Sequence, residues 1–461
     1  MAEAAGPHGI GGPDATAGAV AAALERLAPD AGLPLGLAVS GGSDSVALML
    51  LAADWARERA RGLHVLTVDH GLRAAAAGET AAVCRLATAL GLSVSVLNVC
   101  VARQGNVAAA ARDARLAALS DWSARVGGAP VALAHTLDDQ AETVVMRLAR
   151  RAGADGLAAM DEHRAPFVRP LLGLGRAALR HWLRARDVGW IDDPSNADPA
   201  AERVRARRAL ATLSSAGPSA TDIAASADRL RAQVAVLDWA CDRLAADAEM
   251  GRNAAGAVDF DPIHVADAPG ALSCRLIARA VWQLTGRIYP PRGEALARAC
   301  EAVIAAGRGA RLPETPLALG CVIQGARRGD RPVVAIAREH AACMPPMVLS
   351  GETPFSWDRR LRLSPPFPSD AVIGPLGRHA PDVVEGLGPA WRLDHWSQAG
   401  SAARASAPVL RDRAGALLAV ATPFGWAARP GIAPPATVDL VAERSLSRRS
   451  GPCLSNPRDP A

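Results

Sequence analysis

The chain has 461 residues, a formal net charge of +5, 50% hydrophobic and 21% charged residues, 42 Gly and 34 Pro. This composition excludes a collagen-like protein, a wholly disordered chain and a membrane bundle. The length suffices for roughly two or three domains. All 51 basic residues are Arg, because the sequence contains no Lys. Mechanisms that need a lysine of the protein, such as a Schiff base or a Walker A phosphate loop, are therefore excluded.

The sequence predicts a cytoplasmic protein with no membrane segment. No positive charge precedes Arg26, and no apolar stretch near the start ends in a cleavage site, so we expect no signal peptide. The longest weakly polar stretches are shorter than the ~18 residues that a membrane span needs. The eight Cys form no CxxC pair, so local spacing indicates neither a zinc knuckle nor a redox dithiol. In a cytoplasmic chain we expect reduced thiols, although a pair distant in sequence could still meet in space.

Strand and helix patterns alternate in the first half of the chain. A loose segment, 1–30, contains one helical pattern at 17–27. The following patterns predict strands at 35–39, 63–69, 94–99 and 130–135, and helices at 46–59, 79–90, 107–126 and 138–151. This order predicts an α/β domain over 31–215, with a Rossmann-like parallel sheet covered by helices on both faces. Polar clusters follow three of the strands, at the carboxyl edge where such sheets bind ligands.

The second half of the chain has a different texture. We expect a helical domain over 216–310, a small β-containing (α+β) domain over 311–445 and a disordered tail over 446–461. The patterns in these domains predict helices at 220–246 and 271–306, and strands at 317–323, 333–337, 409–410 and 417–422. Because no internal repeat is visible, a repeat architecture is not indicated.

The loop between the first strand and its helix has the composition of an anion site. Its six residues are Ser40, Gly41, Gly42, Ser43, Asp44 and Ser45. A glycine-rich turn that opens a helix directs backbone N–H groups toward a phosphate or pyrophosphate, and the serines add hydroxyl donors. Asp44 would repel a phosphate unless a cation lies between them, so we predict Mg²⁺ at Asp44. The alternative is an ordinary turn with Ser and Asp as helix caps.

Further motifs follow this loop in a fixed order. They are Val68-Asp69-His70-Gly71-Leu72-Arg73, Gly105-Asn106 with Ala111-Arg112, Ala134-His135-Thr136-Leu137-Asp138-Asp139-Gln140-Ala141-Glu142-Thr143, Arg169-Pro170-Leu171-Leu172, Asp193-Pro194-Ser195-Asn196 and the Arg-rich run 203–208. With the loop, they resemble the tRNA(Ile)-lysidine synthetases of the ATP pyrophosphatase (PP-loop) superfamily, over residues 35–210. A set of motifs in order is far more specific than any one of them.

The resemblance implies a ligase that uses ATP and Mg²⁺. Such an enzyme adenylates C2 of the wobble cytidine, position 34, of a CAU-anticodon tRNA(Ile). It then joins free L-lysine there, releasing AMP and pyrophosphate and changing the codon read from AUG to AUA. The partners implied are tRNA(Ile), L-lysine and no membrane, and the resemblance leaves a homodimer open.

The resemblance also implies the site residues. Asp44, Asp138, Asp139, Glu142 and Arg112 are the catalytic candidates. Asp138 and Glu142 lie four residues apart on one helix face. These carboxylates can hold the ammonium group of lysine, accept its proton or bind Mg²⁺, and the sequence leaves the three roles open among them. The alternative is that Asp138 and Asp139 complement a helix dipole.

Basic residues complete the candidate site. Arg112 and Arg205 are candidates to bind the nucleotide phosphates or the lysine carboxylate. His70, Arg73 and His135 are further candidates for contact with tRNA or lysine. The chain departs from the family pattern at Ala108, where Glu is usual, and at Thr136, where a second His is common.

Charge distribution is compatible with RNA binding. Residues 147–186 contain nine Arg against three acidic residues, which suits a phosphate backbone but also an ordinary solvated surface. Three alternatives remain: a tRNA-cytidine thiolase of the same superfamily, a small-molecule amidating ligase, and a non-catalytic nucleotide- or RNA-binding protein. The absence of a CxxC pair weighs against the first, and no glutaminase-like constellation supports the second.

Overall fold

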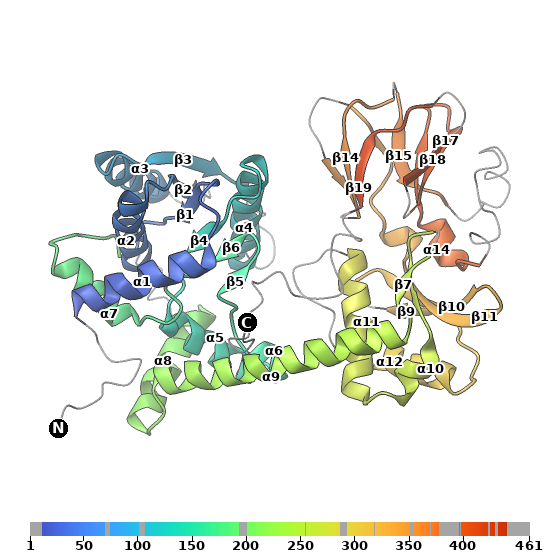
Figure 1. The fold of residues 1–461 in the computed structure, drawn as a ribbon, viewed down its shortest axis with the longest axis horizontal. Coiled ribbons are helices and arrows are strands. Elements are labelled where there is room, and N and C mark those ends of the chain that lie inside the picture. Colours follow the sequence, from blue (N-terminus) through green and yellow to red (C-terminus); the bar gives the residue numbers. More distant parts are fainter. Residues whose placement is uncertain are drawn as a thin grey trace, which may run out of the picture. The chain divides into compact units, whose positions relative to one another are not determined.

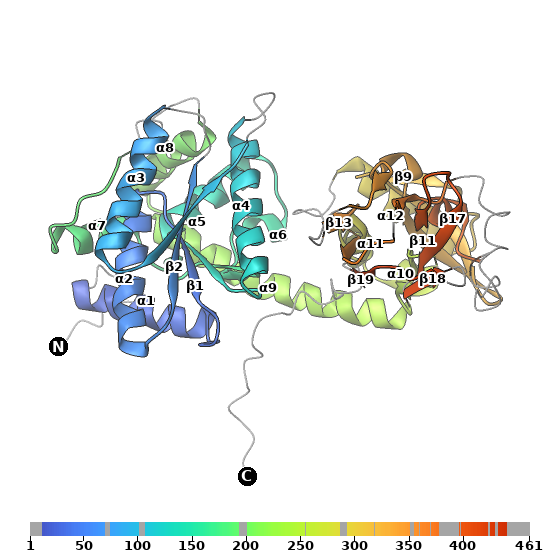
Figure 2. The same cartoon turned by 90° about the horizontal axis from the view of Figure 1, so that it is seen from above.

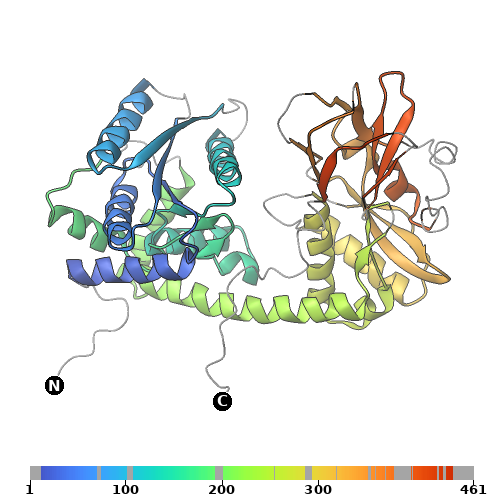
Figure 3. The ribbon, with the colours of Figure 1, turned by 45° about the horizontal axis from the view of Figure 1, so that its top comes forward.

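The computed structural model describes residues 12–69, 74–100, 107–192, 201–253, 255–285, 293–317, 319–350, 355–358, 360–368, 370–377, 396, 398–422, 425–428 and 432–439. The chain forms two compact units that divide between Ala235 and Val236 (Figure 1). Helix α9, Ala220–Asp247, is continuous through this division (Figure 3). His70 and Arg73 lie outside the described residues.

The N-terminal unit is built on a six-stranded sheet in the order β3-β2-β1-β4-β6-β5. Its strands are β1 Leu35–Ala38, β2 Leu63–Asp69, β3 Ser93–Asn98, β4 Val131–Leu133, β5 His163–Arg164 and β6 Phe167–Val168. All neighbouring pairs are parallel except β5 with β6. The predicted parallel sheet is therefore confirmed, and a short antiparallel strand extends one edge.

Helices cover both faces of this sheet, as predicted. They are α1 Pro13–Leu27, α2 Ser43–Arg59, α3 Ala74–Ala89, α4 Val107–Arg125, α5 Leu137–Ala149, α6 Ala154–Leu157, α7 Arg176–Arg184 and α8 Glu202–Ser215. Figure 2 shows α2 and α3 on one side of β1 and β2 and α4 on the other. Met49 of α2 packs with Leu37 and Val65 in one buried cluster, and Leu119 of α4 packs with Leu133 in another. Every predicted strand and helix of this region is present, with ends shifted by a few residues.

The C-terminal unit contains helices and antiparallel sheets. Figure 3 shows its yellow helices toward one end and its orange and red strands toward the other. The helices are α10 Pro262–Asp267, α11 Gly270–Thr285, α12 Glu294–Gly307 and α14 Ser401–Ala405. The strands are β7 Gly251–Arg252, β8 Val258–Phe260, β9 Thr315–Leu317, β10 Cys321–Arg328, β11 Arg331–Arg338, β12 Met347–Val348, β13 Phe355–Trp357, β14 Leu361–Ser364, β15 Val372–Pro375, β16 Pro408–Arg411, β17 Leu417–Thr422, β18 Gly425–Ala428 and β19 Ala436–Asp439.

Three sheets are described in this unit. Their strand orders are β7-β8-β11-β10-β9, β12-β15-β16-β17-β18 and β13-β14-β19. The first packs on α11 and α12 through a buried cluster that includes Ile277, Val303 and Ile336. Strands β7 and β8 come from the segment in which the sequence pattern shows only helices, because two or three residues are too few to reveal a strand alternation.

Two expectations for this unit are wrong. The helical pattern over 271–306 belongs to two helices, α11 ending at Thr285 and α12 beginning at Glu294, rather than to one. Cys274 of α11 and Cys300 of α12 are joined by a disulfide, whereas the predicted cytoplasmic location led us to expect reduced thiols. The two helices bring together cysteines that lie 26 positions apart in sequence, a separation at which no local pattern predicts a contact. No described helix has both the length and the hydropathy that crossing a membrane requires.

Candidate active site

The loop of residues 40–45, called the phosphate loop from here on, connects the carboxyl end of β1 to the first turn of α2. Gly42 is the N-cap residue of α2 and provides no side-chain cap for the first N–H groups of the helix. The Ser45 hydroxyl donates to the carbonyl of Gly42 at 2.9 Å and accepts from the backbone N–H of Ser40 at 3.2 Å. The loop is thus fixed by its own hydroxyl, while the helix N-terminus remains suited to an anion.

Gly41 is required by geometry at this position. Its φ of +88° lies in the left-handed region, and a Cβ atom would stand 3.0 Å from Cδ1 of Ile191. The carbonyl of Gly41 accepts the backbone N–H of Ile191 at 2.9 Å. The turn therefore packs against Ile191, about 150 residues later in the sequence. A side chain at position 41 would disturb the turn and its contact with Ile191.

The carboxylates of α5 are positioned by a capping box. Thr136 is the N-cap residue, and its backbone N–H donates to Oδ2 of Asp139 at 2.8 Å. The N–H of Asp139 in turn donates to the Thr136 hydroxyl at 3.4 Å. The family departure at Thr136 therefore has a structural role, since Thr is a good N-cap. The capping box leaves Oδ1 of Asp139 to interact with other groups.

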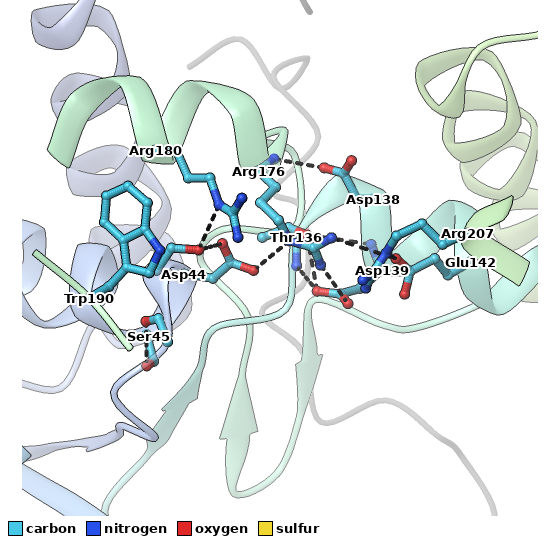
Figure 4. A network of polar contacts seen from close by, with 12 residues as sticks. Asp44, Ser45, Thr136, Asp138, Asp139, Glu142, Arg176, Arg180, Trp190 and Arg207 are labelled. Carbon is cyan, nitrogen blue, oxygen red and sulfur yellow. Dashed lines mark hydrogen bonds and ion pairs between the residues drawn. The ribbon is translucent and has the colours of Figure 1, made fainter. Parts of the chain in front are cut away.

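Arg176, the first residue of α7, connects the phosphate loop to these carboxylates (Figure 4). Its Nε lies 3.0 Å from Oδ2 of Asp44, and its Nη2 lies 3.3 Å from Oδ1 of Asp139. Nη1 is 3.6 Å from Oε1 of Glu142, and the backbone N–H donates to Oδ2 of Asp138 at 2.7 Å. Four carboxylates, which span 98 positions of the sequence, thus converge on Arg176.

Glu142 is fully buried and carries further arginine partners from α8. Nε of Arg203 is 3.0 Å from Oε2, and Nε of Arg207 is 2.9 Å from Oε1. Nη2 of Arg203 also lies 3.2 Å from Oδ1 of Asp139. A buried carboxylate is stable only when paired, so these guanidinium groups allow Glu142 to remain charged.

The charges of the site shift the pKa of Arg176 and His135. Burial lowers the pKa of Arg176, but the carboxylates of Asp44, Asp139 and Glu142 outweigh it, so the pKa lies above its usual value. His135 follows β4, and its pKa is well below 6.5 because it is buried and Arg169 and other guanidinium groups stand near it. Nε of Arg169 donates to Nδ1 of His135 at 3.1 Å, which fits a neutral imidazole ring.

The structure brings most of the predicted residues together. The phosphate loop, Asp138, Asp139 and Glu142 all adjoin Arg176, and His135 immediately precedes the N-cap of α5. Arg112 on α4 and Arg205 on α8 are both exposed. The predicted His70 and Arg73 lie outside the described residues.

Four arginines of the site were not predicted. They are Arg176, Arg180, Arg203 and Arg207, and Nε of Arg180 donates to the Ser43 hydroxyl at 3.2 Å. The available signal was the spacing of Arg203 and Arg207, which are four residues apart and therefore share a helix face. Arg205, two positions from each, points to another face.

Several arginines of the basic segment 147–186 make intramolecular hydrogen bonds. Arg147 donates to the carbonyls of Gly156 and Ala159, and Arg169 and Arg176 are held as described above. The exposed members are Arg150, Arg151, Arg164, Arg184 and Arg186. The surface available to a phosphate backbone is consequently smaller than the sequence count suggests.

Asp44 is the carboxylate of the phosphate loop that suits Mg²⁺. Across the described part of the chain, no group of three or more His, Cys, Asp or Glu side chains converges as a metal site. Mg²⁺ commonly binds through one or two carboxylates together with substrate phosphates, and Asp44 beside the phosphate loop fits that arrangement.

Comparison with known proteins shows several similarities. A family model described as a PP-loop domain matches residues 19–213. The tRNA(Ile)-lysidine synthase of Ruegeria pomeroyi is 41% identical over 349 residues, which cover 74% of this chain and 79% of that relative. The enzyme of the same name from Hyphomonas neptunium is 41% identical over 298 residues, covering 60% and 77%. A U34-tRNA thiolase structure from Methanococcus maripaludis is 17% identical with a TM-score of 0.41, covering 47% of this chain and 78% of that one, and this similarity carries no functional argument.

Proposed function

The chain belongs to the tRNA(Ile)-lysidine synthase family, and from this premise we propose its reaction. It joins free L-lysine to C2 of the wobble cytidine of a CAU-anticodon tRNA(Ile), with cleavage of ATP to AMP and pyrophosphate. We propose that residues 31–215 carry the catalysis and that 216–310 and 311–445 bind the tRNA, in a cytoplasmic protein.

The bridge made by Arg176 is the observation that carries this proposal. It joins Asp44 of the phosphate loop to Asp139 and Glu142 of α5 in one set of contacts of 3.0 to 3.6 Å. An enzyme that first adenylates a base and then attacks it with an amine needs its nucleotide loop and its amine-binding carboxylates side by side. A nucleotide-binding protein without chemistry has no need for a buried carboxylate next to its phosphate loop.

The residues of the phosphate loop suit the polyphosphate of ATP. The N-terminus of α2 and the serine hydroxyls donate to phosphate oxygens, and Asp44 with those oxygens would hold Mg²⁺. When bound, Mg²⁺ neutralises charge on the phosphates. Arg176 and Arg180 lie next to the loop, through Asp44 and Ser43, and can stabilise the charge of the leaving pyrophosphate.

The acidic residues then serve the second step. The C2 oxygen of the cytidine attacks the α-phosphate and pyrophosphate leaves; the lysine amine attacks C2, AMP leaves, and the amine loses a proton. Among the described residues, Asp138 makes no ion pair with an arginine and accepts the backbone N–H of Arg176 instead. We therefore assign to Asp138 the binding and deprotonation of the amine, because Asp139 and Glu142 already have guanidinium partners.

Labelled lysine provides the test. Purified protein, ATP, Mg²⁺ and a CAU-anticodon tRNA(Ile) transcript should give acid-precipitable label, and a tRNA(Met) transcript should give none. Asp138→Asn should still bind ATP but lose the transfer of lysine. Formation of AMP and pyrophosphate with a sulfur donor or ammonia, without label, would favour a thiolase or an amidating ligase. Nucleotide binding with no turnover on any substrate would favour a non-catalytic protein.

A further inference from the structure

A short turn at the end of α6, residues 156–160, is bound by side chains from two different helices. We call it the carbonyl turn, because four of its five backbone carbonyls accept side-chain donors. Ala159 has a φ of +57°, in the left-handed region that residues other than glycine rarely adopt. Such a conformation persists only where the surroundings fix it, so these hydrogen bonds maintain the shape of the turn.

Helix α5 binds the carbonyl turn with the face opposite to Glu142. Gln140, which is 2% exposed, accepts the backbone N–H of Met160 and donates to the carbonyl of the same residue, both at 2.8 Å. Arg147, seven residues later and therefore on the same face as Gln140, donates to two further carbonyls of the turn. Both hydrogen-bonding ends of a buried amide are thus used on one residue, which fixes the rotation of α5 and its position along the helix axis.

Helix α9 binds the same turn through Arg231. Nη2 of Arg231 donates to the carbonyl of Ala158 at 2.7 Å and to that of Met160 at 2.9 Å. Nη1 donates to Oδ1 of Asp228 at 2.6 Å, so a carboxylate one turn earlier on α9 orients the guanidinium group. Figure 1 shows α6, which precedes the turn, beside α9. The carbonyl of Met160 therefore accepts one donor from α5 and one from α9.

Apolar packing alone does not fix α9 against α5 at this place. A pocket of about 210 Å³ opens beside Arg231 and is lined also by Leu137, Gln140, Leu172 and Thr221. A pocket of this size has room for several water molecules, so it interrupts the apolar contact around the first turn of α5. The alignment of α9 with α5 consequently depends on the hydrogen bonds that both helices make to the carbonyl turn.

We propose that Arg231 is a positioning residue for the carboxylates of α5, an inference that rests on the proposed function. Through Met160 and Gln140 it fixes the register of α5, and with it the positions of Asp138 and Glu142. Helix α9 continues into the unit that we propose to bind the tRNA, so the same helix serves that unit and aligns the carboxylates. A misplacement of about 1 Å can cost a hundredfold in rate, so hydrogen bonds remote from the substrate can control the reaction.

Lysidine formation by the full chain, with the CAU-anticodon tRNA(Ile) transcript, tests this role. Arg231→Met keeps the aliphatic stem and removes the donors, so kcat should fall at least about tenfold. The KM for ATP should stay within about twofold, because the hydrogen bonds to the carbonyl turn do not involve the phosphate loop. Arg231→Lys, whose ammonium donates to both carbonyls, should restore kcat to within about threefold of wild type. Arg229→Met removes the same charge from an exposed position of α9 and should keep the wild-type kcat.

A double variant shows whether Arg231 acts through Met160. Gln140→Met should also lower kcat, and adding Arg231→Met should lower it by less than about a further threefold, because both side chains act through one residue. Losses that multiply would mean two independent roles and would overturn the inference. A raised KM for ATP with constant kcat in Arg231→Met, or no recovery in Arg231→Lys, would overturn it as well.

Hydrogen exchange provides a readout that does not need activity. In Arg231→Met, amides of α5 and of residues 154–160 should exchange at least about tenfold faster, while those of α2 keep the wild-type rates. Equal acceleration in α2 would mean a general loss of stability and would overturn the inference, as would unchanged exchange in α5. Wild-type protein that forms no lysidine, with α5 still responding to Arg231→Met, would refute the proposed function while upholding the coupling of α9 to α5.

Discussion

Replacing Arg176 by Gln tests whether one guanidinium group holds the two halves of the site together. Asp44 would lose its ion pair, whereas Asp139 would keep Arg203 and Glu142 would keep Arg203 and Arg207. Removing one partner of a buried ion pair costs about 3–5 kcal/mol when the other charge is left alone. Because two of the three carboxylates retain a partner, we expect a loss of about 1–3 kcal/mol in the free energy of local unfolding.

Hydrogen exchange on peptides from α2, α5 and α8 is the appropriate assay, since it reports local stability in a chain of two units. The loss of protection should be confined to these helices. Lysidine formation should fall by at least tenfold, because Asp44 and Asp139 are no longer held at fixed positions. Arg184→Gln, an exposed residue of the same helix, should change stability by less than about 0.5 kcal/mol. Unchanged protection and unchanged activity in Arg176→Gln would refute the role of the bridge.

Four further predictions concern single residues of the site. Asp44→Ala should abolish ATP turnover while circular dichroism and the urea midpoint stay close to wild type; persistent turnover would contradict our assignment of the phosphate loop. Gly41→Ala should destabilise the chain by about 1–2 kcal/mol in urea unfolding, because of its positive φ and the contact with Ile191, whereas Gly42→Ala, with a negative φ and no atom within 3.8 Å, should cost less than about 0.5 kcal/mol. His135 stays neutral in the fold, but the unfolded chain binds a proton there below pH 6.5, so the free energy of unfolding decreases as the pH falls below 6.5, and His135→Asn should flatten this slope. Arg207→Gln should lower the free energy of unfolding in urea by only about 0–1 kcal/mol, because the Arg207 side chain is 44% exposed and Glu142 keeps Arg203 and Arg176 as partners.

Local sequence patterns predicted most of the N-terminal unit. Its strands and helices have distinct periodicities, and the phosphate loop and the motif of α5 both lie at strand ends, where a parallel sheet collects its ligands. The convergence of Asp44 with Asp138, Asp139 and Glu142 was therefore predictable in outline. Thr136 was visible as a departure from the family pattern, and the capping box that it forms is encoded within four residues.

The arginine partners could not be predicted in the same way. Arg176 meets Asp44 across 132 positions and Asp139 across 37, and Arg207 meets Glu142 across 65. No periodicity connects such distant segments. Because every basic residue of the chain is Arg, composition does not distinguish these arginines from those on the surface. A run of arginines such as 203–208 does not reveal which helix face meets the carboxylates, and Arg205 stays a prediction. The break between α11 and α12 and the pairing of Cys274 with Cys300 depend in the same way on tertiary packing.

The absence of lysine has a consequence for the chemistry proposed here. The activated C2 of an adenylated cytidine is open to attack by any neutral primary amine within reach, and a lysine side chain near the carboxylates would compete with the substrate. The cations that contact these carboxylates in the described structure are guanidinium groups, which stay protonated and are poor nucleophiles. Arginine therefore supplies the positive charge that the buried carboxylates need without offering a rival amine. Under the proposed function, Asp138 then deprotonates the amine of the free lysine substrate, and no lysine side chain of the protein competes with it.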